Sequence, residues 1–166
     1  MHEFVFQADD ESDTQRLGAA LARTLPSGTT VALIGTLGAG KTRLVQALAT
    51  ACGVPPETVV SPTFVLCHEY HGQRSLYHLD AYRLKDDDEF LQLGPEEYFE
   101  SDGITLIEWA DRVLNCLPPQ RLEIHIDVVG HTARRFRLVA VGEEETSRRL
   151  DDLAAALGGD ARDSGG

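Results

Sequence analysis

The chain of 166 residues has few cysteines and no long apolar run. Its three cysteines, Cys52, Cys67 and Cys116, are odd in number and widely spaced, which matches neither a disulfide framework nor a zinc site and favours buried thiols. No apolar run approaches the roughly 20 residues of a membrane span, and the N-terminus lacks the basic region of a secretory signal. These absences predict a cytoplasmic protein without a membrane partner.

Positive charge is also scarce. Lysine and arginine number 15 against 27 aspartates and glutamates, which gives a net charge of −12. Non-specific binding to nucleic acid requires a basic surface, so this balance argues against it. Residues 80–102 hold nine acidic residues against Arg83 and Lys85. Such a segment is either a solvated face or a docking surface for a basic protein, and composition leaves both open.

Residues 35–42 read Gly-Thr-Leu-Gly-Ala-Gly-Lys-Thr and match G-x-x-x-x-G-K-[ST], the phosphate-binding P-loop. A strand pattern over residues 29–34 precedes the motif and a helical pattern follows it, and this context gives the motif its meaning. In such a loop, backbone N–H groups surround phosphate oxygens at a helix N-terminus. Lys41 would reach the β- and γ-phosphates, and the Thr42 hydroxyl would hold Mg²⁺. The motif predicts a nucleoside triphosphate site.

Apolar periodicity predicts one α/β domain over residues 1–157, with a disordered tail over residues 158–166. The predicted fold class is a P-loop NTPase-like three-layer domain with a mixed, mainly parallel central sheet and an antiparallel edge. The predicted elements are a strand over 3–7, a first helix after 9–13, a P-loop helix to residue 51, a hairpin of 64–70 and 75–80, short helices over 86–93 and 111–117, a buried parallel strand over 104–107, an antiparallel edge pair over 121–128 and 135–141, and a last helix around 150–157.

A P-loop site needs a second acidic group near the metal, ordinarily at the end of a neighbouring strand. Asp80 ends the predicted strand 75–80, and Glu108 directly follows the apolar run 104–107. Ligands of open α/β sheets bind at the carboxyl ends of the strands. Because the strand before Glu108 is the more plainly central one, Glu108 ranks slightly ahead of Asp80, and the choice between them stays open.

Other segments of the sequence give weaker indications of a functional site. Residues 61–63 (Ser-Pro-Thr) resemble a switch that follows a γ-phosphate, with an ordinary Ser-Pro turn as an equal alternative. A lone tryptophan such as Trp109 is more often part of a core than of a site. Arg134, Arg135 and Arg137 would supply charge to phosphates, although alternating arginines on an edge strand are commonly just solvated. No histidine of the predicted hairpin has a nucleophile placed beside it.

Four motifs follow one another along the sequence: the P-loop, Ser-Pro-Thr-Phe at 61–64, His-Leu-Asp-Ala-Tyr-Arg-Leu at 78–84 and Ile-Glu-Trp at 107–109. In this order they resemble the motifs of the TsaE family (older name YjeE), small bacterial P-loop ATPases of tRNA threonylcarbamoyladenosine synthesis. The resemblance covers about residues 6–141. Four motifs in one order are far more specific than a P-loop alone.

The resemblance implies an ATPase that uses ATP and Mg²⁺ and is weak alone. Such a protein works with TsaD, the threonylcarbamoyl transferase, and with TsaB. Together they form the threonylcarbamoyl group on adenosine 37 of tRNAs that read codons beginning with A. The resemblance implies only indirect contact with tRNA, since the chain would not transfer the group itself.

The family's functional residues carry over by position. Lys41, Asp80 and Glu108 would be catalytic, and Thr42, Glu108 and Asp80 would lie at the metal. The segment before the first long helix would lie near the adenine, through Asp13 or Thr14. The remaining nucleotide contacts would come from Leu37, Gly38, Ala39, Gly40, Thr63, Trp109 and Arg134.

Two positions depart from the family pattern. Thr36 stands where the family usually has Asp, and Ala81 stands where it usually has Leu. Neither position contacts phosphate or metal in the family, so we expect activity to survive. The missing acid at position 36 would affect partner docking or the pace of turnover.

Two other functions remain open from the residues alone. A small-molecule kinase shares the P-loop, but kinases of this size usually carry an Arg-rich lid, and the segment between Asp80 and Glu108 is acidic instead. The second alternative is a nucleotide-gated adaptor whose ATP hydrolysis is incidental. A phosphorylated small molecule formed one for one with ATP consumed would identify the kinase.

Overall fold

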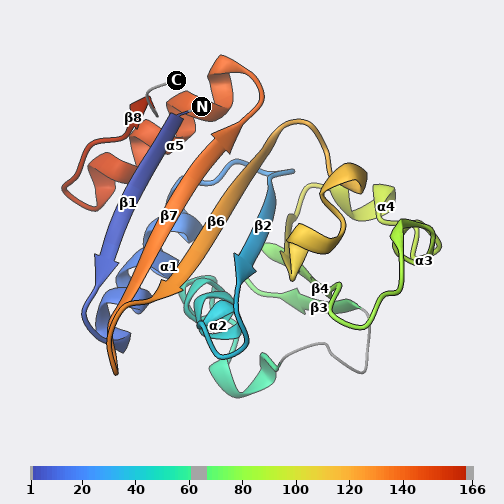
Figure 1. The fold of residues 1–166 in the computed structure, drawn as a ribbon, viewed down its shortest axis with the longest axis horizontal. Helices are drawn as coiled ribbons and strands as arrows, with labels where there is room; N and C mark the ends of the chain where they lie inside the picture. The colour runs from blue at the N-terminus through green and yellow to red at the C-terminus, as the bar shows by residue number, and fades with distance from the viewer. Residues whose placement is uncertain (1, 61–66, 164–166) are drawn as a thin grey trace.

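Parallel strands form the middle of an eight-stranded mixed sheet (Figure 1). The computed structural model describes residues 2–60 and 67–163. The two central parallel strands, over residues 30–35 and 104–108, are near-continuous apolar runs because both of their faces are covered. In spatial order the parallel strands are β4 (Ser75–Asp80), β5 (Ile104–Glu108), β2 (Thr30–Gly35) and β6 (Arg121–Val128).

Antiparallel strands extend the sheet on both sides. On one side β3 pairs with β4, and on the other side β7, β1 and β8 follow β6 in that order. These strands are β3 (Cys67–His71), β7 (Arg134–Val141), β1 (His2–Ala8) and β8 (Arg162–Asp163). The mixed sheet with a parallel centre and antiparallel strands confirms the predicted fold class. The hairpin is confirmed for its described residues, while residues 64–66 lie outside them.

The pair of β6 and β7 is confirmed, but it does not form the edge of the sheet. β1 pairs with β7 along its whole length, so the N-terminal strand continues the sheet. Phe4 and Phe6 are both buried, and the ring of Phe6 lies 6.5 Å from that of Phe136 on β7. These buried aromatic contacts explain why β1 lies beside β7.

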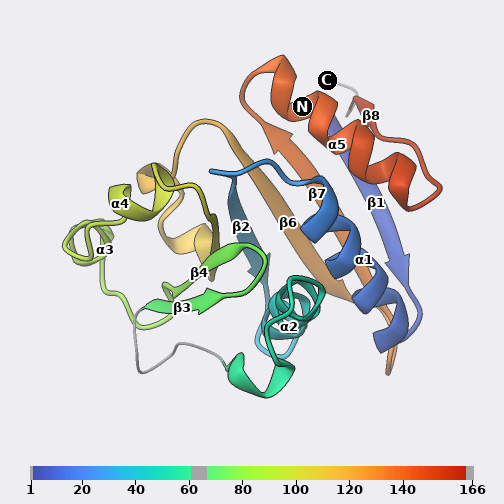
Figure 2. The same ribbon diagram turned by 180° about the vertical axis from the view of Figure 1, so that it is seen from behind.

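Three long helices cover one face of the sheet, as Figure 2 shows from behind. They are α1 (Glu11–Thr24), α2 (Lys41–Ala51) and α5 (Glu144–Ala156). α1 begins where the Asp10 side chain accepts hydrogen bonds from Ser12 N and Asp13 N, the ordinary N-cap arrangement. α2 ends before Gly53, whose φ of 86° turns the chain out of the helix. The apolar sides of these helices and the strands beneath them form the larger hydrophobic core.

A smaller core lies on the opposite face, over β4, β5 and β2. It is covered by α3 (Asp87–Leu91) and by the 3₁₀ turns η2 (Ala110–Arg112) and η3 (Leu114–Cys116), with α4 (Glu96–Phe99) beside them. On this face the described residues place no helix over β6, β7 and β1 (Figure 1). The three layers are therefore complete only at the β4–β5–β2 end of the sheet.

The prediction of one short helix over residues 111–117 is wrong. The chain forms two 3₁₀ turns there instead. Trp109 before the first turn has a left-handed φ of 58°, and Val113 between the turns has φ of −132°. Because neither backbone conformation belongs to an α-helix, the hydrogen bonds of a longer helix are not formed.

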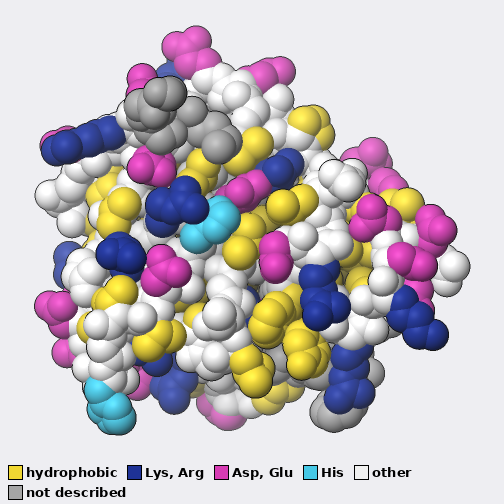
Figure 3. Space-filling view, viewed as in Figure 1, with side chains coloured by type: hydrophobic (Ala, Val, Ile, Leu, Met, Phe, Trp, Pro, Cys, Tyr) yellow, Lys and Arg dark blue, Asp and Glu magenta, His cyan; other side chains and the backbone are white. Residues whose placement is uncertain are grey.

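The acidic segment over residues 80–102 surrounds α3 and α4. Acidic side chains gather at that side of the molecule in Figure 3. The Asp86 side chain caps α3 by accepting from Glu89 N. A docking role for this surface stays a prediction. No helix in residues 2–60 and 67–163 is long and apolar enough to cross a membrane.

The described part of the chain ends in the short strand β8, and the predicted disordered tail over residues 158–166 stays a prediction. Arg162 and Asp163 pair with β1, and His2 contacts two aspartates there. His2 Nδ1 lies 2.7 Å from Asp163 Oδ1, and His2 Nε2 lies 2.6 Å from Asp151 Oδ1. These contacts bring the two ends of the chain together (Figure 1). The extent of a single domain over residues 1–157 stays a prediction.

We expect the stabilising effect of His2 to depend on pH. Hydrogen bonding to Asp151, the main cause, and to Asp163 raises the pKa of His2. A raised pKa means that the folded protein binds the proton more tightly than the unfolded chain does. The stabilisation is therefore fully present below the unfolded pKa of about 6.5 and is lost as pH rises through the raised folded pKa. His2→Gln should lower the melting temperature more at pH 5.5 than at pH 9.

His131→Gln is the matched control, because His131 is exposed on the β6–β7 turn. Its melting temperature should follow that of the unaltered protein at both pH values. An equal loss for His2→Gln at both values would contradict the role of the charged imidazole.

Gly18 allows α1 and α2 to pack in close contact. A Cβ at this position would lie 2.4 Å from Ala47 Cβ and 2.7 Å from Leu48 N of α2. Alanine in a helix interior is intrinsically about 1 kcal/mol more stable than glycine. Here the clash with the α2 backbone should reverse that sign, so Gly18→Ala should lower the stability by about 1–3 kcal/mol. Thermal melting checks this, with Gln15→Ala on the exposed side of α1 as the control that should change little.

Candidate active site

The P-loop motif forms the turn between β2 and α2, at the carboxyl ends of the parallel strands. Gly38 and Gly40 have positive φ angles of 78° and 113°, and a Cβ added at either would meet no atom within 4 Å. At Gly35 a Cβ would lie 2.9 Å from Ile126 O, so the loop packs against β6 only because glycine is present there. No side chain caps the start of α2 at Lys41. The loop is therefore open where phosphate would approach a helix N-terminus.

The Lys41 side chain is held beside this loop. Its Nζ donates to Gly35 O at 2.7 Å and to Thr36 O at 2.9 Å. It also lies 4.0 Å from the centroid of the Trp109 ring. Burial lowers the pKa of Lys41, and the neighbouring carboxylates, Glu108 first, oppose that change. The ammonium therefore lies inside the loop and donates to two backbone carbonyl oxygens. Phosphate oxygens would replace these carbonyls as its hydrogen-bond acceptors.

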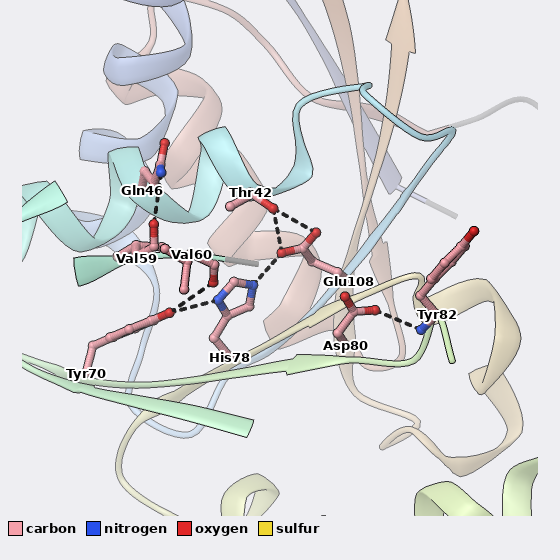
Figure 4. Close-up of polar contacts among 9 residues, drawn as sticks. All are labelled: Thr42, Gln46, Val59, Val60, Tyr70, His78, Asp80, Tyr82 and Glu108. Carbon is pink, nitrogen blue, oxygen red and sulfur yellow. Dashed lines mark hydrogen bonds and ion pairs between the residues drawn. The ribbon is translucent and has the colours of Figure 1, made fainter. Parts of the chain in front are cut away.

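Thr42 and Glu108 meet across the site (Figure 4). Thr42 Oγ1 lies 3.0 Å from Glu108 Oε1 and 2.9 Å from Glu108 Oε2. Glu108 ends β5 and is only 3% exposed. Since β5 is the direct neighbour of β2, the end of β5 lies beside the start of α2. A hydroxyl and a carboxylate this close supply the oxygen ligands that Mg²⁺ prefers.

Asp80 lies beside Glu108 at the end of the neighbouring strand. The two residues are cross-strand partners in the parallel pair of β4 and β5. Asp80 is buried, and its Oδ1 accepts from Tyr82 N at 2.7 Å in the turn after β4. The hydrogen bonds of Thr42 go to Glu108. The choice between Glu108 and Asp80 as the acid at the metal stays a prediction.

Glu108 has a second partner that the sequence predictions do not include. His78 Nε2 lies 2.5 Å from Glu108 Oε2, and His78 Nδ1 lies 3.2 Å from the Tyr70 hydroxyl (Figure 4). One signal in the sequence points to this position. His78 and Asp80 are two residues apart on β4, so both side chains point to the same face of the sheet.

Trp109 forms the border of the site on the other side. Among the described residues it alone has a positive φ without being glycine. Its ring lies 4.9 Å from that of Tyr82, and the guanidinium of Arg112 lies 5.5 Å from the Tyr82 ring. The left-handed backbone turns the indole over Lys41 at the point where β5 ends.

Arg134 contacts the P-loop backbone. Its Nε donates to Ala39 O at 3.0 Å, and its NH1 donates to Gly130 O and Ala133 O. The start of β7 is thereby tied to the P-loop. Leu37, at the tip of the loop, is 80% exposed. A direct contact of Arg134 or Leu37 with nucleotide stays a prediction.

The predicted adenine side lies at the start of α1. Asp13 Oδ2 accepts from Asp9 N at 2.9 Å, and this hydrogen bond is the main reason why the pKa of Asp13 is lowered. Thr14 is buried beneath it. The Thr132 hydroxyl donates to Asp9 O at 2.9 Å, so the β6–β7 turn lies beside this segment. Base contacts stay a prediction, and residues 61–63, with Thr63 among them, lie outside the described residues.

Known proteins of one family resemble this chain in sequence. The family model of "Threonylcarbamoyl adenosine biosynthesis protein TsaE" matches residues 8–136. The chain is 41% identical over 124 residues to a tRNA threonylcarbamoyladenosine biosynthesis protein TsaE of Treponema pallidum, which covers 75% of this chain and 91% of that protein. It is 36% identical over 155 residues to the Bacillus subtilis TsaE protein, covering 89% and 96% of the two chains.

A solved structure shows the same fold. The crystal structure of Bacillus subtilis YdiB superposes with a TM-score of 0.78 and 29% sequence identity. The match covers 93% of this chain and 97% of that one. The whole arrangement of sheet and helices is therefore shared and is not limited to the P-loop.

Proposed function

The chain belongs to the TsaE family of tRNA threonylcarbamoyladenosine biosynthesis, and we propose that it supports this modification by binding ATP with Mg²⁺ and hydrolysing it. One observation carries the proposal. The Thr42 hydroxyl is hydrogen-bonded to the buried carboxylate of Glu108, at the start of the helix whose first residue, Lys41, places its ammonium in the P-loop. A hydroxyl, an acid and a lysine at a P-loop are the groups that hold Mg²⁺ and a triphosphate.

The residues of the site fit these two ligands. The backbone of residues 37–42 would hold the phosphates, and Lys41 would exchange its carbonyl partners for phosphate oxygens. Thr42 and Glu108 would hold Mg²⁺, which supplies charge stabilisation at the phosphates when it is bound. Asp80, adjacent to Glu108 in the sheet, would lie near the attacking water or the metal. Trp109 would cover this side of the site.

The partners in this proposal are TsaD and TsaB. TsaD would transfer the threonylcarbamoyl group to adenosine 37, while this chain would consume ATP so that the complex completes repeated cycles. Contact with tRNA would be indirect, in keeping with the net charge of −12. The complex would act in the cytoplasm.

The test is an ATPase assay of this chain alone and together with TsaB and TsaD, followed by a measurement of tRNA modification. We expect slow phosphate release alone, faster release in the complex, and multiple rounds of modification only with hydrolysable ATP. Absence of ATP binding would contradict the proposal. Equal modification with a non-hydrolysable ATP analogue would favour the nucleotide-gated adaptor instead.

A further inference from the structure

His78 is fully buried between two polar side chains. Its exposed fraction is 0%, and it lies on β4 below the end of the strand. One ring nitrogen faces the carboxylate of Glu108, and the other faces the hydroxyl of Tyr70 on β3 (Figure 4). A buried polar side chain of this size persists where both of its polar atoms have partners.

Both ring nitrogens of His78 have a hydrogen-bond partner. A carboxylate only accepts hydrogen bonds, so in the contact with Glu108 the donor is His78 Nε2. On the other side of the ring, the Tyr70 hydroxyl lies 3.2 Å from His78 Nδ1. Contacts at both nitrogens, from β5 and from β3, hold the plane of the imidazole ring in one orientation.

The carboxylate of Glu108 needs such a contact to be fixed. The last torsion of a glutamate is broad and has no sharp staggered minima, so the β5 backbone alone does not set the plane of the carboxylate. The Thr42 hydroxyl holds it from the side of α2, and His78 holds Oε2 from the side of β4. Two contacts from two different elements define one orientation.

We propose that His78 is a positioning residue that orients the Glu108 carboxylate toward Thr42, with Tyr70 fixing the orientation of the imidazole. The inference rests on the proposed function, because it concerns the pair of oxygens that would hold Mg²⁺. Hydrogen-bond partners of metal ligands commonly change metal affinity or activity by about 10- to 100-fold when they are removed. His78 itself contacts neither phosphate nor metal in this role.

The experiment measures ADP binding by calorimetry with Mg²⁺ and in EDTA, together with the Mg²⁺ concentration that half-saturates ATP hydrolysis. For His78→Leu we expect half-saturation at an Mg²⁺ concentration about 10- to 100-fold higher. Its ADP affinity in EDTA should be unchanged, because Lys41 and the P-loop backbone are unaltered. His78→Gln keeps an N–H donor near the Nε2 position and should restore much of the Mg²⁺ dependence.

Tyr70→Phe removes only the hydroxyl that contacts His78 and so tests that contact with a minimal change. It should raise the half-saturating Mg²⁺ concentration by a smaller factor than His78→Leu does. Tyr77→Phe is the matched control, since Tyr77 is adjacent to His78 on β4, points to the other face and packs its ring 5.0 Å from Tyr98. It should leave the Mg²⁺ dependence unaltered.

The outcomes separate the two proposals. If the unaltered protein does not bind ADP, the proposed function fails. If it binds ADP normally and His78→Leu loses thermal stability without any change in Mg²⁺ dependence, His78 is merely structural and the inference is overturned. If His78→Leu does not fold, Tyr70→Phe decides: an unchanged Mg²⁺ dependence overturns the inference, and a raised half-saturating concentration supports it.

Discussion

Replacing Lys41 with alanine is expected to weaken ATP binding by about 10- to 100-fold, because a hydrogen bond to a charged group contributes about 1.5–3 kcal/mol. Hydrolysis should fall below detection, since the same ammonium would stabilise the charge that develops on the phosphates. In the structure this group lies within the loop, 2.7 Å from Gly35 O. Calorimetry with ATP and a phosphate-release assay measure the two effects.

Two variants control for this change. Lys41→Met keeps most of the aliphatic stem and removes the ammonium, so it should lose ATP binding as alanine does. Lys85 is the only other lysine in the sequence and is exposed, so Lys85→Ala should bind and hydrolyse ATP normally. Normal ATP binding by Lys41→Met would contradict the assignment of Lys41 to the phosphates.

Replacing Glu108 with glutamine is expected to slow ATP hydrolysis by at least about 100-fold, since the glutamine has no charge to offer Mg²⁺. Glutamine keeps the size of the side chain and an oxygen that accepts from Thr42, so the fold should be preserved. Nucleotide affinity in EDTA should also be preserved, because Glu108 contacts Thr42 and His78 rather than the phosphate loop backbone. Turnover and binding are therefore separated in this variant.

Asp80→Asn and Glu123→Gln complete the comparison. Asp80→Asn should also lower turnover more than binding, because Asp80 adjoins Glu108 in the sheet. Glu123 lies on β6, where it pairs with Arg121 at 2.7 Å and takes no part in the site, so Glu123→Gln should hydrolyse ATP normally. Unchanged hydrolysis in Lys41→Ala, Glu108→Gln and Asp80→Asn together would overturn the whole site.

Local patterns predicted much of the fold. The P-loop strand and helix, the first and last helices and the antiparallel partners all follow from the spacing of apolar residues, because each pattern lies within one short segment. The region after Trp109 shows where this fails. Residues 111–117 have a helical pattern but form two 3₁₀ turns, because the φ angles of Trp109 and Val113 do not belong to an α-helix. Val113 belongs to the smaller core and Trp109 packs against it, and that core includes residues of distant segments, which no local pattern contains.

The sequence by itself determined the P-loop, because residues 35–42 hold the loop, the lysine and the hydroxyl in one continuous stretch, and it predicts that phosphate binds there. Only the tertiary structure decided which acid meets Thr42. Asp80 and Glu108 both end parallel strands, and the sequence favours Glu108 only slightly. In the sheet, β5 is the direct neighbour of β2, and β4 is one strand further away. The same strand order placed His78 against Glu108. Strand order and register depend on pairing between distant segments, and no local pattern contains them.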